Sequence, residues 1–182
     1  MQTMTMTRGL PVAAALLLLA ACQNQNAQPT ASGANPGEVR FTTDAYQIIQ
    51  FDRQEGALAQ TQAKDSEVQA LAAQLTNQAN QFAAQLTPVA TAASIAPPKV
   101  LRDDLRVRLS HMQLQQGQDF DRTYVGDQIA SHEEVLKLEN GMGNEGVSPQ
   151  FLRLMQQGTG LLQANLDKLR TLQTRIGPAP RV

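Results

Sequence analysis

Apolar side chains recur at helical spacing over residues 41–176. The clearest stripe begins after Ser66 and keeps the alternating four- and three-residue steps of a helix packed nearly parallel to its neighbours. Its members are Val68, Ala72, Leu75, Ala79, Phe82, Leu86 and Val89, widened by Leu71 and Ala83. We expect Ser66 to be the N-cap, with Gln69 completing a capping box. Residues 87–98 should end this helix, because their closing pair of prolines cannot lie inside one.

The same periodicity predicts three other long helices and one short helix. The long ones should cover about residues 43–64, 119–140 and 149–176, with Ser148 as the N-cap of the last, and the short one residues 100–113. No segment combines strand-like alternation with turn signals. These elements predict an all-α four-helix bundle with an extra short helix in the connection between the second and third long helices.

The N-terminal segment carries a different pattern. Residues 1–7 are polar, and Arg8 supplies a positive charge. An apolar run over residues 10–21 ends in Leu-Ala-Ala, directly before Cys22. The run is shorter than the roughly 20 apolar residues of a membrane-spanning helix, and its charge and small final residues are typical of a secretory signal. We predict a signal peptide over residues 1–21 and lipid attachment at Cys22, as in a bacterial lipobox. The alternative is an ordinary signal peptide beside a coincidental cysteine.

Lipid attachment would place the protein in the cell envelope, because two or more acyl chains anchor a protein stably in a membrane. By analogy with enteric bacteria, Gln23 in place of an Asp favours the outer membrane, with the domain facing the periplasm. Residues 22–40 should then be the lipidated cysteine and a disordered tether, since they hold few large apolar side chains. Residues 41–176 should form the folded domain, and residues 177–182 a loose tail.

Composition narrows the classes of function. Lys and Arg number 15 against 16 Asp and Glu, so there is no basic excess to neutralise a phosphate backbone, and we expect no nucleic-acid partner. Cys22 is the only cysteine, which excludes a disulfide framework within the chain and a multi-thiolate metal site.

Three segments resemble the DUF4142 family of exported, ferritin-like helical proteins of bacteria. The most specific is GQDFDRTYVGDQIASHEEVLKLEN, residues 117–140, which is similar to the family's pattern of Gly, Phe-Asp, Tyr and then His on one helix. The segments DSEVQALAAQL, residues 65–75, and FLRLMQQGTGLLQANLDKLRTL, residues 151–172, are similar to the start of its second helix and to its last helix. The resemblance covers most of residues 41–176 and implies a ferritin-like bundle.

The resemblance also implies that polar side chains point into the bundle. The corresponding positions here hold Asp52, Gln78 with Ala79, Asp121, His132 and Asn165, so two of the family's three histidines and one carboxylate are replaced. Only Asp52, Asp121 and His132 remain as candidate metal ligands. A di-iron bundle needs Glu-x-x-His pairs, which this chain lacks, and zinc needs at least three converging ligands. We therefore expect no metal and no cofactor.

Structural roles account for the same residues. Asp121 would favour its helix as an acid in the first turn. His132 would be a buried histidine held by a hydrogen bond to Asp52, Tyr124 or a backbone carbonyl, and Asp52, Asp121 and His132 could pair with one another. Ser131 adjoins His132, but neighbouring helical side chains diverge by about 100° and cannot form a catalytic dyad. We expect no catalytic residues.

Three hypotheses for function follow from the sequence. The first is a non-enzymatic envelope lipoprotein whose bundle binds a protein or another envelope component. The second is a ferritin-like metal or redox protein with a reduced site at Asp52, Asp121 and His132. The third is a structural spacer on the membrane.

Overall fold

Five helices make up the described part of the chain, residues 34–140 and 146–179 of the computed structural model. They are α1 (Pro36–Gln62), α2 (Ser66–Ala92), α3 (Asp103–Gln113), α4 (Gly117–Asn140) and α5 (Pro149–Ile176). Within these residues the extended backbone pairs only in a single bridge between Ala63 and Gly117. The predicted all-α class is confirmed.

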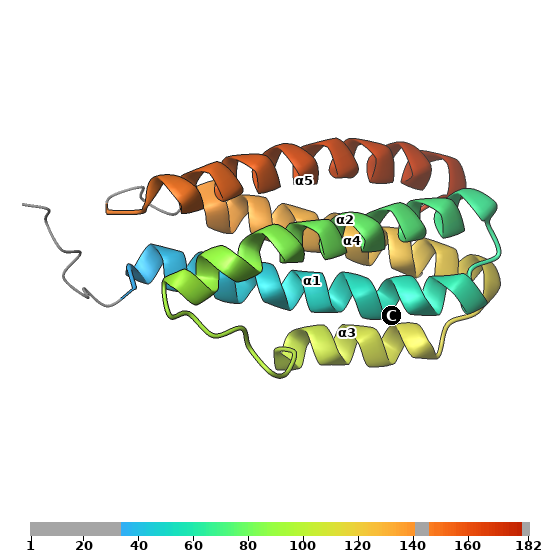
Figure 1. Cartoon of the computed structure of the whole chain (residues 1–182). Coiled ribbons are helices and arrows are strands. Elements are labelled where there is room, and N and C mark those ends of the chain that lie inside the picture. The colour runs from blue at the N-terminus through green and yellow to red at the C-terminus, as the bar shows by residue number, and fades with distance from the viewer. Residues whose placement is uncertain (1–33, 141–145, 180–182) are drawn as a thin grey trace, which may run out of the picture. The chain divides into compact units, whose positions relative to one another are not determined.

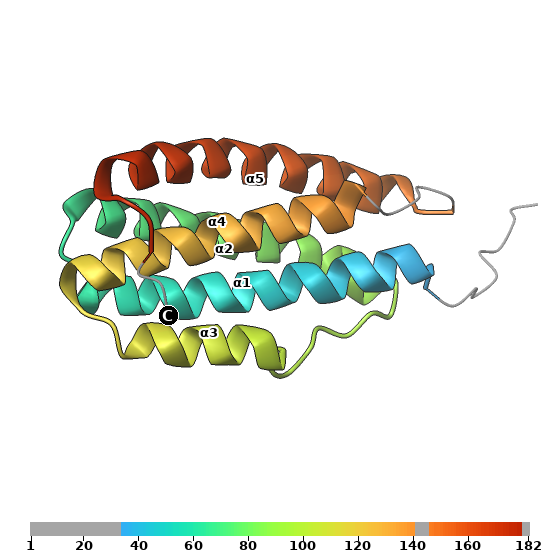
Figure 2. The same ribbon diagram turned by 180° about the vertical axis from the view of Figure 1, so that it is seen from behind.

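The four long helices form two antiparallel hairpins that lie side by side (Figure 1). α1 packs chiefly on α2, and α4 on α5, while contacts of α1 with α4 and of α2 with α5 close the bundle. α3 belongs to the long connection between α2 and α4 and lies against α1 and α4, as the view from behind also shows (Figure 2). Two helical hairpins joined by one long crossover connection make a four-helix bundle. The predicted four-helix bundle with an extra short helix is therefore confirmed.

The first helix starts earlier than the sequence pattern predicts. α1 begins at Pro36, seven residues before the expected start, and the Asn35 side chain caps it by accepting a backbone hydrogen bond at 2.8 Å. The expected tether is therefore too long, because residues 36–40 are helical. Glu38 ties this turn to the bundle, since its carboxylate accepts a hydrogen bond from the backbone N of Ser148 at 2.8 Å.

The start of α2 also differs from the prediction. Its N-cap is Asp65, whose Oδ1 accepts hydrogen bonds from the backbone N of Glu67 at 2.9 Å and of Val68 at 3.2 Å. Ser66 is thus the first helical residue and not the cap. Gln69 does not complete a capping box: its Nε2 donates to the backbone carbonyl of Ala63 at 2.9 Å.

The end of α2 lies beyond the first proline of the predicted breaker. Pro88 is exposed inside the helix, which continues to Ala92. In the preceding turn the hydroxyl of Thr87 donates to the carbonyl of Ala83 at 2.7 Å. The helix stops where Ser94 takes a positive φ of 59°. The other helix starts shift by a few residues: α3 begins three residues later, and α4 two residues earlier, than predicted.

The predicted stripes form the core. Along α2 the side chains from Val68 to Leu86 on the expected face are at most 9 % exposed. Near the start of α1, the rings of Phe82 and Phe151 pack edge to face on Phe41, with centroids 6.4 and 6.3 Å from it. These three rings belong to one apolar cluster, which we call the apolar end.

Several predictions for the N-terminal segment lie outside the described residues. These are the signal peptide, Cys22, most of the tether and residues 180–182 of the tail. Among the helices that the structure does describe, none is long and apolar enough to cross a membrane.

Candidate functional site

A layer of buried polar side chains crosses the middle of the bundle. Gln128 of α4 donates from its Nε2 to Oδ1 of Asp52 at 3.0 Å and to Oε2 of Glu55 at 2.7 Å. The two acids lie one turn apart on α1, so they share a face and meet the same amide. Asp52 is 8 % exposed, and Glu55 and Gln128 are fully buried. We call Asp52, Glu55, Gln128 and His132 the polar layer.

Burial dominates the charge state of the two acids. It raises the pKa of Asp52 to about 7, against the smaller lowering by the Gln128 hydrogen bond and by Arg108. It raises the pKa of Glu55 well above the usual value, and the neighbouring charge of Asp127 adds to the rise. Both carboxyl groups therefore lose their proton less readily than an exposed acid does.

His132 completes the layer as a neutral imidazole. Its Nδ1 lies 2.8 Å from the backbone carbonyl of Gln128, one turn earlier on α4. Because a carbonyl only accepts, Nδ1 carries the proton and Nε2 keeps a free lone pair. Burial lowers the pKa of His132 to about 4, against the opposing effect of that hydrogen bond. The prediction of a buried histidine held by a backbone carbonyl is confirmed.

A small cavity adjoins the polar layer. Its volume is about 60 Å³, it is partly open to solvent, and all four long helices contribute to its wall. The polar side chains in the wall belong to Asp52, Gln78, His132, Glu139 and Asn165. Apolar side chains of the wall include Phe41, Ile48, Ile49, Leu75, Phe82 and Leu162.

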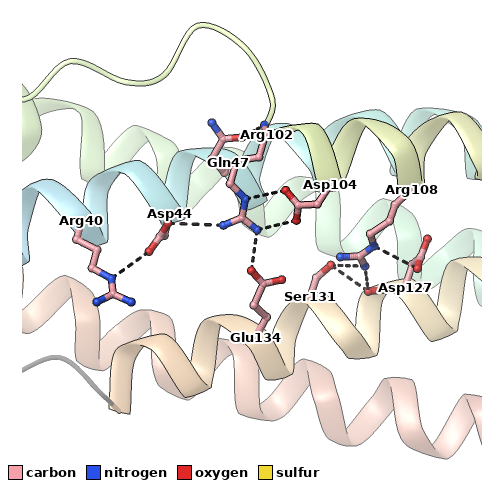
Figure 3. Close-up of polar contacts among 9 residues, drawn as sticks. All are labelled: Arg40, Asp44, Gln47, Arg102, Asp104, Arg108, Asp127, Ser131 and Glu134. Atoms are coloured by element: carbon pink, nitrogen blue, oxygen red, sulfur yellow. Dashed lines mark hydrogen bonds and ion pairs between the residues drawn. The ribbon is translucent and has the colours of Figure 1, made fainter.

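Arg108 of α3 fastens this helix over the polar layer. Its guanidinium donates to the backbone carbonyl of Asp127 at 2.6 Å and to the hydroxyl of Ser131 at 2.8 Å (Figure 3). It also lies 4.8 Å from the ring centroid of Phe51. The same cation lowers the pKa of Asp52, so α3 acts electrostatically on the buried acids.

A second arginine fastens the other end of α3. Arg102 donates to Glu134 at 2.7 Å and lies 3.7 Å from a carboxylate oxygen of Asp44, which joins α3 to both α4 and α1 (Figure 3). Its backbone N donates to Oε1 of Gln47 at 2.8 Å. The two arginines together keep the outer side of the polar layer covered by protein.

The sequence matches the family model "Domain of unknown function (DUF4142)" over residues 21–172. The protein belongs to the DUF4142 family. Among solved structures, this DUF4142 chain is similar to a DUF305 fragment from Deinococcus radiodurans, with a TM-score of 0.67 and 14 % sequence identity. That similarity covers 79 % of this chain and 99 % of the other, and at such identity it shows the fold alone. No curated protein matches the DUF4142 chain.

The structure brings together most of the positions that the DUF4142 resemblance singles out. Asp52, Gln78 with Ala79, His132 and Asn165 come from four different helices and all line the same cavity. Ala79 is 7 % exposed and Asn165 is 4 % exposed, as expected for side chains that point into the bundle. The inward orientation that the resemblance implies is therefore confirmed for these positions.

Asp121 is the exception. Its two carboxylate oxygens accept hydrogen bonds from the backbone N of Lys64 and of Asp65, both at 3.0 Å, so it braces the turn between α1 and α2. It lies eleven residues, or about 16 Å, along α4 from His132. The expected mutual pairing of Asp52, Asp121 and His132 is therefore wrong, because Asp121 serves the end of the bundle and not its middle.

The reduced metal site does not fit this geometry. With Asp121 occupied elsewhere, Asp52 and His132 alone remain of the three candidate ligands, fewer than zinc needs from a protein. Over residues 34–140 and 146–179, no group of three or more His, Cys, Asp or Glu side chains is placed to hold a metal ion.

The sequence analysis missed Glu55 and Gln128. Glu55 lies three residues after Asp52, on the face that the apolar pattern marks as inward, and this spacing was the available signal. Gln128 lies four residues before His132 on the inward face of α4, among glutamines that are common on exposed faces of this chain. The pairing of the two across helices is a tertiary contact that no local pattern marks.

Proposed function

We propose that this protein is a non-enzymatic lipoprotein of the bacterial cell envelope, held by lipid on Cys22, whose helical bundle is a binding domain for an envelope component. The outer membrane, with the bundle facing the periplasm, is the location that we propose. The alternative metal or redox function needs a ligand set that the structure separates, so no observation favours it.

The main support for a binding function is the cavity beside the polar layer. Binding sites for small groups are concave and mostly apolar, with a few polar atoms that fix orientation. This cavity has such a wall, and the side-chain oxygens of Gln78 and Asn165 are buried with no hydrogen-bond partner in the described protein. Buried polar atoms without partners are costly, and a ligand that pairs with them would offset that cost.

The contacts of the polar layer support binding over catalysis. Ser131, the hydroxyl nearest to His132 in sequence, accepts from Arg108 at 2.8 Å and donates to the carbonyl of Asp127 at 2.9 Å. Gln128 in turn donates a hydrogen bond to each of the two acids of the polar layer. These groups hold one another in place within the bundle.

Cell fractionation tests the anchoring part. The variant Cys22→Ser should lose incorporation of labelled palmitate and move from the membrane fraction to the soluble fraction, because the only thiol that could accept lipid is gone. Cys22→Ala is the matched second variant and should behave alike. Membrane association that survives both changes would contradict the proposal.

Site-specific photo-crosslinking in intact cells tests the binding part. A photoreactive residue at Leu161, in the cavity wall, should give a crosslinked product that the same residue at Gln163 does not. Gln163 is exposed on the same helix and does not line the cavity, so it is the matched control. Identical products from both positions, or none from Leu161, would contradict a binding role for the cavity.

A further inference from the structure

Acids and hydrogen-bond acceptors predominate in the polar part of the cavity wall, beside the side-chain amides of Gln78 and Asn165. Two of its side chains are acids, Asp52 and Glu139, and the third titratable side chain is His132, whose Nδ1 is paired with the backbone carbonyl of Gln128. Among the described residues of this wall there is no Lys and no Arg. The wall therefore offers hydrogen-bond acceptors and negative charge, with no cation of its own to satisfy them.

Two side-chain amides of the wall contain a buried oxygen without a hydrogen-bond partner, an observation that does not depend on the acids. Asn165 is 4 % exposed, and its Oδ1 has no hydrogen-bond partner in the described protein. The Oε1 of Gln78, on the neighbouring helix α2, is also buried and has no hydrogen-bond partner in the described protein. Both are carbonyl oxygens, so what they lack is a donor.

The acids of the wall come from different helices. Asp52 lies on α1, while Glu139 lies on α4, seven residues and two turns after His132, so those two share a face. Glu139 accepts a hydrogen bond from Thr159 at 2.6 Å through Oε2, and its Oε1 remains available. Arg108, the cation that lowers the pKa of Asp52, is committed to Asp127 and Ser131 on α4.

The remaining wall and the size of the cavity limit the ligand. Aliphatic and aromatic side chains surround the acceptors, which suits an organic group better than a hydrated inorganic cation that requires six or more oxygen ligands. A cavity of about 150 Å³ holds benzene, so 60 Å³ takes a head group with a short alkyl segment. A longer tail would leave through the open side.

We infer that the cavity binds the ammonium head of a small organic amine, with its alkyl chain against the apolar wall. A primary ammonium brings three donors and one positive charge, which matches a wall of acceptors and acids. This inference rests on the proposed binding function and names the ligand class of the same cavity.

Three probes of equal chain length test the charge preference. The purified protein is titrated with propylammonium, 1-propanol and propionate, and the ¹⁵N resonance of Nε2 of His132 is followed by NMR. Propylammonium should bind with a Kd about tenfold below that of 1-propanol, and propionate should give no saturable shift. Equal affinities for the ammonium and the alcohol would overturn the inference, because the acids would then contribute nothing.

Two variants test whether the acids of the cavity wall cause the preference for propylammonium over 1-propanol. Asp52→Asn and Glu139→Gln each remove one acid at nearly constant size, and each should raise the Kd for propylammonium about tenfold while changing that for 1-propanol less than about twofold. Glu139 is half-buried, so its variant serves even if Asp52→Asn folds poorly.

Asp167→Asn is the control for these variants. Asp167 is exposed on α5, two residues from Asn165 and outside the cavity wall, so its variant should leave all three affinities within about twofold. If it weakened propylammonium binding as much as the cavity variants do, only net charge would be acting and the inference would fail. Fractionation and photo-crosslinking use other readouts, so loss of the ammonium preference alone would leave the proposed function standing.

Discussion

The apolar end and the polar layer share α1 but are held by different forces. On α1, Phe41 and Asp52 are eleven residues apart, about three turns, so both point into the bundle. Phe41 is held by apolar packing alone, because its ring packs edge to face on those of Phe82 and Phe151. Asp52 needs Gln128 to pair with it, and even so burial raises its pKa to about 7.

The comparison links the apolar end to the stability of the fold and the polar layer to function. Burial of the aromatic rings at the apolar end stabilises the fold, whereas burial of Asp52 and Glu55 costs free energy. Polar groups retained in the middle of a bundle at such a cost are the usual mark of a functional site. The proposed binding cavity lies where the two regions meet, since Phe41, Phe82, Asp52 and His132 all line it.

The largest expected effect comes from breaking the apolar end. Phe82→Ala should lower the free energy of unfolding by about 3–5 kcal/mol, because Phe82 is 9 % exposed and its ring packs on Phe41. Urea unfolding followed by circular dichroism measures the loss. The neighbouring exposed Gln81 supplies the control, since Gln81→Ala should change stability by less than about 0.5 kcal/mol. A similar small loss at Phe82 would show that the apolar end does not carry the stability.

The next effect is a pH dependence that belongs to the polar layer. The folded pKa of Asp52, about 7, lies above its unfolded value of 3.8. Its contribution to stability is therefore fully present below pH 4 and is lost as the pH rises towards 7, by about 4 kcal/mol. Asn mimics the protonated acid, so the stability of the wild type relative to Asp52→Asn should fall over this range.

Other groups titrate in the same window and must be separated from Asp52. His132 has the opposite sign, because its folded pKa of about 4 lies below 6.5, so its contribution is present above pH 6.5 and lost as the pH falls. It is common to wild type and variant and cancels in the difference to first order. A difference that stays constant from pH 4 to pH 8 would mean that Asp52 is not buried as an acid.

The sequence predicted the apolar end more fully than the polar layer. The stripe from Val68 to Leu86 could be read because helical burial leaves a period along one chain segment. The family resemblance predicted that Asp52, Asn165 and His132 point into the bundle, and the structure places all three in the wall of one cavity. Local patterns and family positions are both properties of single segments, so the sequence carries them directly.

The polar pairings could not be predicted from local sequence patterns, because each one joins segments that are far apart in the chain. Gln128 and Glu55 are 73 residues apart, and neither residue type marks a core by itself. Asp121 shares a helix with His132, yet its partners are two backbone amides 56 and 57 residues earlier. The prediction of the α2 N-cap was wrong for a similar reason. Asp65 and Ser66 are both residue types that favour the N-cap position. Asp65 also accepts a hydrogen bond at 2.7 Å from Arg175, which lies on the last helix.

A smaller, local effect should follow from releasing α3. Arg108→Ala removes two hydrogen bonds, the contact with Phe51 and the ion pair with Asp127, and should cost about 1–3 kcal/mol. Hydrogen exchange should speed up in α3 more than in α5, since α3 packs chiefly on α1 and α4.

Arg106→Ala is the control for this change. The partner of Arg106 is Asp103 on the same helix, and both side chains are exposed, so the loss should be at most about 0.5 kcal/mol. Uniform acceleration of exchange across all helices in Arg108→Ala would show that α3 unfolds only with the whole bundle, and that the cover over the polar layer is not a separate unit.

The smallest expected effect is a gain, and it compares two glycines of α5. A Cβ at Gly160 would meet no atom within 4 Å, so Gly160→Ala should stabilise the helix by about 0.5–1 kcal/mol. A Cβ at Gly158 would lie 3.3 Å from Cζ of Phe82, tighter than ordinary contact, so Gly158→Ala should lose that gain. Urea unfolding of both variants measures the difference. In the Phe82→Ala background the ring is gone, and Gly158→Ala should then recover the gain. If it does not, the close contact with the apolar end is not what requires a glycine at this position.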